Sequence, residues 1–206
     1  MELSRNIALI IHFFIDECIP PILRDRKWFM WLPFKLLFKD KANCFFDFKD
    51  NAVRISEKEF RRIYKDTSSV HLKRETDLNN ECIEEIEKNI ISGKILDIGC
   101  GRGHLANMLS KKYKVTACDI IISKEIIQKK SLANFVQANI KDLPFDDNEF
   151  DTVICTHTLE HVIDIFAAIK EIRRVTKSRL ILVVPKQRPY RFTFDLHLHF
   201  FLTLPP

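Results

Sequence analysis

Glycine is scarce in this sequence. Only four glycines occur among the 206 residues, and all four lie between positions 93 and 103. Glycine is needed where the backbone takes a positive φ or where a ligand must come close to it. The distribution therefore indicates segment 93–103 as a place where the backbone approaches a ligand.

Paired cysteines are missing as well. The chain has six cysteines, but no two of them stand at the C-x-x-C spacing of metal or redox motifs. Cys100, Cys118 and Cys155 lie in apolar runs or at their ends, where a free cysteine behaves as a small buried hydrophobic residue. We therefore expect no disulfide framework and a reducing, cytoplasmic compartment.

Long apolar runs are also lacking. No run approaches the ~18 residues that a membrane-spanning helix needs. The apolar segment 7–15 is followed by Asp16, Glu17 and two prolines, and no small-residue cleavage site follows it. We expect neither a transmembrane helix nor a signal peptide.

The charge is mild and uneven. The net charge is +5, and the stretches 24–49 and 170–191 are basic. Basic stretches are common on solvated faces, although they can also favour anionic partners. An Asn-Pro-Pro-Tyr-like signature of nucleic-acid amino methylation is absent after residue 156, so we expect no nucleic-acid partner.

Two domains are expected. Residues 1–70 form an aromatic-rich N-terminal extension or cap around Trp28–Phe34, with a short helix predicted at 57–65. A second helix is predicted at 77–92, where Asp77 can cap the start and Gly93 follows the end. We assign residues 71–206 to the second domain.

From Lys94 onward, short apolar strands alternate with amphipathic helices. This alternation predicts a Rossmann-like, doubly wound parallel sheet of the α/β class, flanked by helices and with an incomplete C-terminal part. Strict alternation of apolar and polar residues at 192–200 predicts a last, half-buried strand. The expected strands are 94–98, 115–119, 135–140, 151–156 and 179–184, and the expected helices are 104–112, 123–131 and 162–175.

The first of these strands runs into the glycine segment. Its end reads Asp97-Ile-Gly-Cys-Gly-Arg-Gly103, which is D-x-G-x-G-x-G and not the dinucleotide fingerprint G-x-G-x-x-G/A, because His104 stands at the last position. An acid at this place repels a pyrophosphate and attracts an ammonium group. S-adenosylmethionine carries an amino group and a sulfonium but no phosphate, so the site suits it better than NAD.

A second acid ends the next strand. Asp119 follows Asp97 by 22 residues, and a carboxylate there can accept hydrogen bonds from both hydroxyls of an adenosine ribose. NAD needs the same acid. Asp119 therefore supports the binding of an adenosine but does not by itself indicate methyl transfer.

Segment 94–185 resembles the class I S-adenosylmethionine-dependent methyltransferases of the "methyltransferase type 11" kind. Four motifs occur in the family's order: the D-x-G-C-G-x-G loop, Asp119, Gln137–Phe145 and Phe150–His161. Asn139 stands where the family often has Asp. The resemblance implies that S-adenosylmethionine is the cofactor and that Thr156, His157 and His161 border a small-molecule or lipid-like substrate. The cofactor-binding residues that it implies are Asp97, Gly99, Cys100, Gly101, Gly103, Asp119, Ile120, Asn139, Ile140 and Thr156.

The sulfonium is already a strong electrophile, so catalysis consists mainly of aligning the acceptor with the methyl group. A hydroxyl or a carbon acid also needs a general base, and His157 is the candidate because histidine titrates near neutral pH. The alternative is a polar loop histidine without a catalytic part.

Other interpretations stay open. His157–His161 matches the zinc-peptidase pattern H-x-x-E-H, but that pattern needs both histidines on one helix, and we expect no metal site. The aromatic and basic segment 28–41 suits peripheral contact with a membrane, or else packing as a cap. Only about twenty residues follow Pro185, so a truncated, non-catalytic cofactor-binding protein is the second hypothesis for function.

Overall fold

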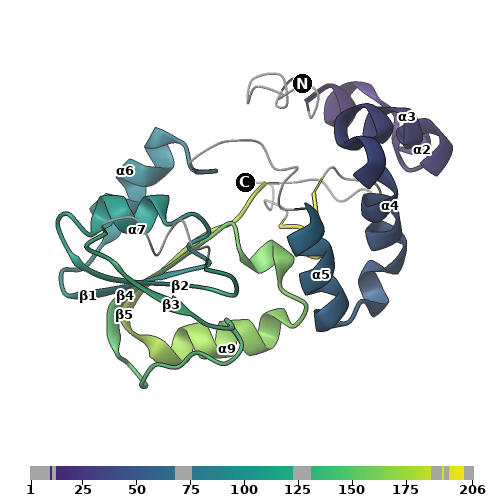
Figure 1. Cartoon of the computed structure of the whole chain (residues 1–206). Coiled ribbons are helices and arrows are strands. Elements are labelled where there is room, and N and C mark those ends of the chain that lie inside the picture. The colour runs from purple at the N-terminus through teal and green to yellow at the C-terminus, as the bar shows by residue number, and fades with distance from the viewer. Residues whose placement is uncertain are drawn as a thin grey trace. The chain divides into compact units, whose positions relative to one another are not determined.

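The computed structural model describes residues 10, 13–67, 76–122, 131–186, 192 and 195–201. The chain divides into two compact units, which are coloured by residue number in Figure 1. The sheet unit comprises residues 75–185, and the helical unit comprises residues 1–74 together with 186–206.

This division differs from the expected boundary at residue 70, which grouped residues 186–206 with the sheet. Within the helical unit, the ring of Phe192 lies 5.2 Å from the ring of Phe46. Lys49 Nζ lies 3.2 Å from Asp195 Oδ1. These contacts join the C-terminal residues to the N-terminal helices.

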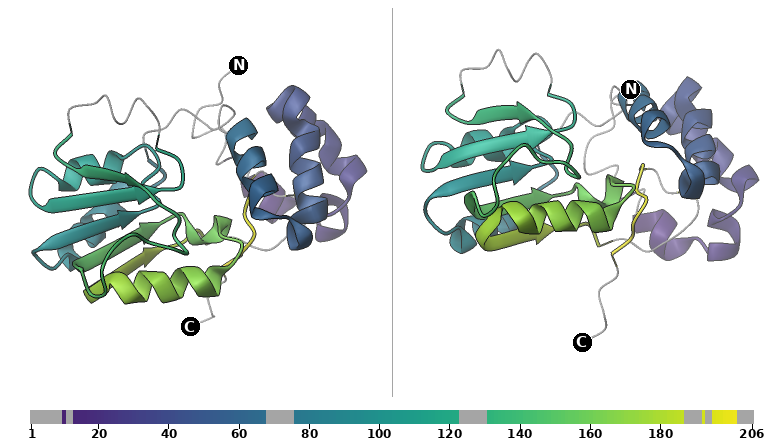
Figure 2. Two further views of the ribbon diagram at one scale, coloured as in Figure 1. Left: turned by 60° about the horizontal axis from the view of Figure 1, so that its bottom comes forward. Right: turned by 90° about the horizontal axis from the view of Figure 1, so that it is seen from below.

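The sheet unit contains five strands, all parallel, in the order β3-β2-β1-β4-β5. Helices α6 and α7 cover one face of the sheet and α9 covers the other (Figures 1 and 2). This arrangement confirms the predicted doubly wound α/β fold. The strands are β1 (Lys94–Ile98), β2 (Lys114–Asp119), β3 (Asn134–Gln137), β4 (Phe150–Thr156) and β5 (Thr176–Val183), and the helices are α6 (Asn80–Asn89), α7 (His104–Leu109), the 3₁₀ turn η5 (Leu159–His161) and α9 (Ile165–Val175).

The middle strands form the core of this unit because both of their faces are covered by helices. Ile95 and Leu96 of β1 and Val153 and Ile154 of β4 have no exposed surface. Burial on both faces explains why these strands read as continuous apolar runs in the sequence. The expected helix at 123–131 lies almost wholly outside the described residues.

Helix α6 starts later than expected. Asn79 is its N-cap and its side-chain oxygen accepts a hydrogen bond of 2.7 Å from the backbone N–H of Cys82. The prediction of Asp77 as the cap is therefore wrong. Leu78 precedes the helix and is buried in the core.

The half-buried strand expected at 192–200 is also wrong for the positions that the structure describes. Residues 195–200 form no strand. The side chain of Asp195 accepts a hydrogen bond of 3.0 Å from the backbone N–H of His197, which closes a turn instead. Phe192 and Leu196 are nevertheless buried.

The helical unit is built around aromatic side chains. Met30, Phe34, Phe46 and Phe48 are fully buried in its core. The predicted helix at 57–65 is confirmed as α5, and none of the described helices is long and apolar enough to cross a membrane. The helices are α2 (Pro21–Arg24), α3 (Lys27–Phe38), α4 (Ala42–Asn51) and α5 (Glu57–Thr67), with the π-helical turn η1 (Phe14–Cys18) and the 3₁₀ turns η2 (Lys39–Lys41) and η3 (Ala52–Arg54).

Candidate functional site

The glycine segment turns the chain at the carboxyl end of β1. The backbone N–H groups of Gly99 and Cys100 both donate to the carbonyl of Cys118, at 2.8 and 3.1 Å, so the turn is held against the end of β2. Gly99 has a φ of +72°, and a Cβ there would overlap the hydroxyl of Thr158. Glycine at this position is therefore required by packing as well as by conformation.

Gly101 is different. Its φ is +51°, and no described atom lies within 4 Å of the point where a Cβ would stand. The backbone at Gly101 thus faces open space. A ligand can lie against this part of the loop without meeting a side chain. Gly103, the last glycine of the loop, is the N-cap of the six-residue helix α7.

Asp97 lies beneath this loop and is only 1% exposed. Its Oδ2 atom is buried and has no hydrogen-bond partner among the described residues. Burial, together with the nearby charge of Asp119, raises the pKa of Asp97 from 3.8 to about 7, and the backbone N–H of Ala106 opposes this shift. A buried carboxylate oxygen without a partner fits a cationic ligand such as the ammonium group of S-adenosylmethionine.

Asp119 ends β2 beside the glycine turn. Its Oδ2 accepts a hydrogen bond of 2.9 Å from the backbone N–H of Gly101, and its Oδ1 accepts one of 3.1 Å from Ile121. Burial raises the pKa of Asp119, and these backbone donors, including Ile120, together with the charge of His161 oppose the shift. A carboxylate offers about four acceptor positions, so beside three backbone donors the side chain can still accept a bond from a ribose hydroxyl.

Asn139 and Ile140 follow β3 at the same end of the sheet. The backbone N–H of Ala138 donates to the carbonyl of Asp119 at 2.9 Å, which holds this segment against the end of β2. The side-chain oxygen of Asn139 accepts a hydrogen bond of 3.1 Å from the backbone N–H of Lys141. The amide oxygen therefore closes a local turn.

The end of β4 forms the other side of the site. Thr158 joins the two central strands, because its hydroxyl donates to the carbonyl of Thr156 at 2.9 Å and lies 3.5 Å from that of Ile98. His157 has a left-handed φ of +49°, and its backbone N–H donates to the carbonyl of Val183 on β5. A positive φ at a non-glycine residue is strained and is common at functional sites.

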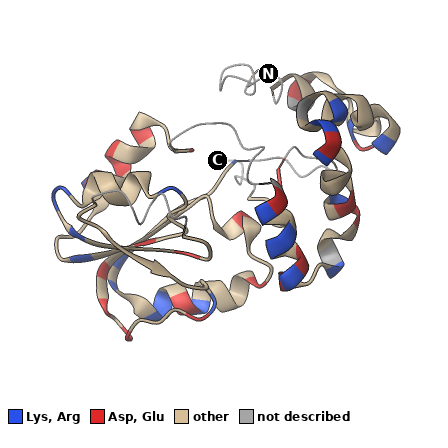
Figure 3. Ribbon diagram, in the orientation of Figure 1, with Lys and Arg blue, Asp and Glu red and all other residues tan. Residues whose placement is uncertain are grey.

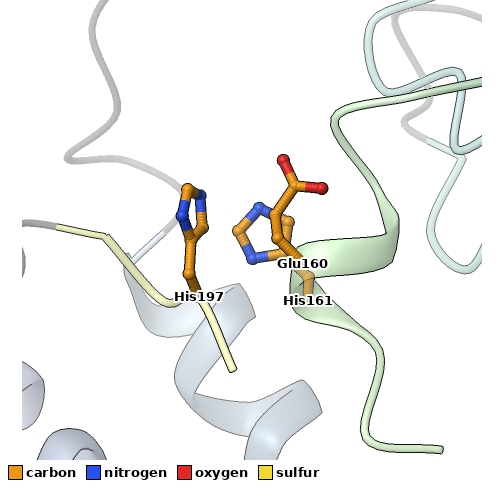
Figure 4. A group of neighbouring side chains, drawn as sticks. All are labelled: Glu160, His161 and His197. Atoms are coloured by element: carbon orange, nitrogen blue, oxygen red, sulfur yellow. The ribbon is translucent and has the colours of Figure 1, made fainter. Parts of the chain in front are cut away.

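Beneath His157 lies a buried acid. Nδ1 of His157 is 3.5 Å from Oε1 of Glu160, whose side chain is only 1% exposed, whereas His157 is 27% exposed. Glu160 and His161 project from the turn η5 (Figure 4). The two histidines of H-x-x-E-H do not share a helix, because α9 begins only at Ile165. The helical context of a zinc-peptidase site is thus absent in this described segment.

Three contributors to the site are not predicted as site residues from the sequence. Thr158 packs against Gly99, and the ring of Phe135 packs against Gly103. Glu160 is visible in the sequence only as part of a metal pattern, and its role beside His157 depends on the turn η5. The remaining candidates, Cys100, Ile120 and Ile140, are partly buried at the same edge of the sheet.

Residues 96–184 match a protein-family model described as "Methyltransferase domain". The chain is 41% identical over 91 residues to the uncharacterized protein MJ0638 of Methanocaldococcus jannaschii, covering 44% of this chain and 39% of that protein. It is 34% identical over 121 residues to the ubiquinone/menaquinone biosynthesis C-methyltransferase UbiE of Shewanella woodyi, covering 50% and 48% of the two chains.

Among solved structures, the YcgJ protein of Bacillus subtilis aligns with a TM-score of 0.45 and 28% identity over half of each chain. The chain spans less than half the length of the curated relatives it matches. The matched segment contains the glycine loop, both buried acids and the end of β4. Segment 96–184 is therefore similar to the methyltransferase domain of class I enzymes, and its five-stranded parallel sheet fits that fold.

Proposed function

We propose that this chain transfers a methyl group from S-adenosylmethionine to a small-molecule or lipid-like acceptor. The observation that carries the proposal is the unpartnered, buried Oδ2 of Asp97, which lies beneath an open glycine loop and near a second carboxylate, Asp119. Asp97 would hold the ammonium group, directly or through water or backbone. The backbone at Gly99–Gly103 would pack against the methionine part, and Asp119 would bind the ribose. S-adenosylmethionine supplies an electrophilic methyl group when it is bound.

The acceptor class is supported by the similarity to a ubiquinone/menaquinone biosynthesis C-methyltransferase. An aromatic carbon acid or a hydroxyl must lose a proton during methylation. His157 is the proposed base, and Glu160 beneath it would hold Nδ1 so that Nε2 faces the acceptor. With a quinol precursor as acceptor, we expect His157→Gln to lower kcat by about 100-fold and KM little. A loss of kcat in His157→Gln that is equal at every pH would contradict the role of His157 as the general base.

The cofactor proposal is tested by calorimetric titration of S-adenosylmethionine into the wild type and Asp119→Ala. We expect saturable binding by the wild type and affinity weakened at least about tenfold in the variant, because a charged acceptor of hydrogen bonds is lost. Asp146→Ala removes an exposed acid from the loop before β4 and serves as the matched control. A folded wild type that binds no cofactor would overturn the proposal and favour the non-catalytic alternative.

A further inference from the structure

Helix α3 is apolar on two opposite faces. Met30 and Phe34 point into the core of the helical unit and have no exposed surface. At 100° per residue, the positions of four other apolar side chains form one stripe roughly 140° wide on the opposite side of the helix. These four, here called the α3 apolar surface, are Trp28, Trp31, Leu32 and Leu36, which are 72%, 47%, 58% and 72% exposed.

Exposed apolar residues are concentrated in this part of the chain. Of thirteen large hydrophobic residues exposed in the described structure, eight lie between Ile10 and Leu36. The other five are scattered from Ile91 to Leu182 in the sheet unit. Single exposed hydrophobic residues are ordinary, but four that share one stripe of a helix, as on α3, mark a surface that binds something.

The charges around the surface are mainly basic. Residues 24–41 contain six Lys or Arg and two Asp, and of the six only Arg24 is buried. Lys35 lies within the stripe, is about half exposed and lies 3.8 Å from Asp40. Lys27 stands at the start of the helix, is also about half exposed and pairs with Asp50 at 3.1 Å. Helix α5, by contrast, carries acidic and basic residues along its whole length (Figure 3).

The length of α3 limits how it can meet a bilayer. A helix of twelve residues is about 18 Å long, which is too short to cross a hydrocarbon core of ~30 Å. Tryptophan favours the interface between lipid and water, and lysine beside it favours anionic headgroups. A short helix with such a face lies in the plane of the interface.

We propose that the α3 apolar surface docks on an anionic lipid membrane, with Trp28 and Trp31 at the level of the headgroups. The proposal goes beyond the methyl transfer proposed above, because docking requires neither cofactor nor acceptor. Each can therefore fail while the other holds.

The chain provides its own probe for this docking. Its only two tryptophans both lie on the α3 apolar surface, so intrinsic fluorescence reports directly on it. We expect the emission of the full chain to shift to the blue with phosphatidylcholine–phosphatidylglycerol vesicles, and the protein to sediment with them. With phosphatidylcholine alone, or at high salt, both effects should be much weaker.

Two double variants distinguish binding through the α3 apolar surface from nonspecific binding through other exposed hydrophobic residues. Trp28→Gln with Leu36→Gln should lower vesicle partitioning at least about tenfold while leaving Trp31 as the probe. Leu132→Gln with Phe166→Gln changes two residues that are 79% and 84% exposed elsewhere, and it should leave partitioning unchanged. Circular dichroism spectra of both double variants should match that of the wild type, which would show that they fold.

Three results would overturn the proposal. The first is unchanged emission and no sedimentation of the folded wild type with anionic vesicles. The second is an equal loss of partitioning in the two double variants. The third is a blue shift that grows with protein concentration without lipid and disappears in Trp28→Gln/Leu36→Gln, which would assign the surface to a second copy of the chain.

Discussion

Ionisation of Asp97 lowers the free energy of unfolding of the ligand-free protein. Its side chain is buried, one oxygen has no partner among the described residues, and its pKa rises to about 7. The unfolded chain releases this proton near pH 3.8, whereas the folded chain keeps it until about pH 7. Between these values the folded state binds more protons, so this group's contribution to the free energy of unfolding falls as the pH rises.

Asp97→Asn removes this titration and keeps the shape of the side chain. We expect the variant to be more stable than the wild type by roughly 4 kcal/mol above pH 7.5 and nearly equal to it at pH 4. The amide should at the same time strongly weaken binding of S-adenosylmethionine, because it has no negative charge to pair with the ammonium group. Urea unfolding of both proteins at several pH values measures the difference.

A stability difference between wild type and Asp97→Asn that stays constant from pH 4 to pH 8 would show that the carboxyl is not buried as described. Cofactor binding supplies a second check. Because a cation favours the ionised form of Asp97, wild-type affinity should rise with pH up to about 7 and binding should release a proton below it.

At the level of elements, Arg174 of α9 fastens the loop that leads from β3 to β4. Its guanidinium donates to the carbonyls of Leu143 and Phe145 at 3.0 and 2.7 Å and pairs with Glu171 and Asp147 at 2.8 and 2.9 Å. The ion pair with Arg174 lowers the pKa of Glu171 to about 2. This loop continues from Asn139 and Ile140, which the family resemblance implies as cofactor-binding residues, so the anchor bears on that part of the site.

We expect Arg174→Ala to lower the free energy of unfolding by about 2 kcal/mol, since two carbonyls and two carboxylates lose charged donors. Affinity for S-adenosylmethionine should fall several-fold as the loop loosens. Arg173→Ala, an exposed arginine next to it on the same helix, should change the unfolding free energy by less than about 0.5 kcal/mol. Similar losses in the two variants, measured by urea unfolding, would contradict the anchoring role.

The elements also show what the sequence could predict. Strands β1 and β4 are predicted closely because they are buried on both faces and each contains a run of at least four consecutive buried residues. The start of α6 is misplaced because Asp77 and Asn79 are both good capping residues, and only the tertiary position of Leu78 selects Asn79. The alternation at 192–200 is wrong as a strand, because the side chain of Asp195 supplies a turn that the pattern does not reveal.

The site follows the same rule. Asp97, Asp119 and the glycine loop are predictable because strand ends in a parallel sheet meet at one edge. Thr158 and Phe135 are not predictable from the sequence, because they contribute by packing against glycines that lie far from them in the chain. No local pattern encodes such a contact.

At the scale of the whole molecule, residues far apart in the chain close the helical unit. Lys49 Nζ pairs with Asp195 Oδ1 at 3.2 Å across 146 positions of sequence, and its side chain is only 4% exposed. Burial lowers the pKa of Lys49, while Asp195 opposes the shift. The ammonium group also donates to the carbonyl of His197 at 3.4 Å. The C-terminal segment is thus tied to α4 by a buried charge.

Removing one charge of a buried ion pair lowers the free energy of unfolding more than removing both, because the remaining charge stays buried without its partner. We expect Asp195→Asn to lower the free energy of unfolding by about 3 kcal/mol, because it leaves the ammonium of Lys49 buried without its partner. Lys49→Met keeps the apolar length of the side chain, and the double variant Lys49→Met/Asp195→Asn should lose only about 1 kcal/mol. Limited proteolysis should then cleave the C-terminal segment faster in Asp195→Asn than in the double variant. If the double variant were as unstable as Asp195→Asn, the turn at Asp195, and not the ion pair, would hold the segment in place.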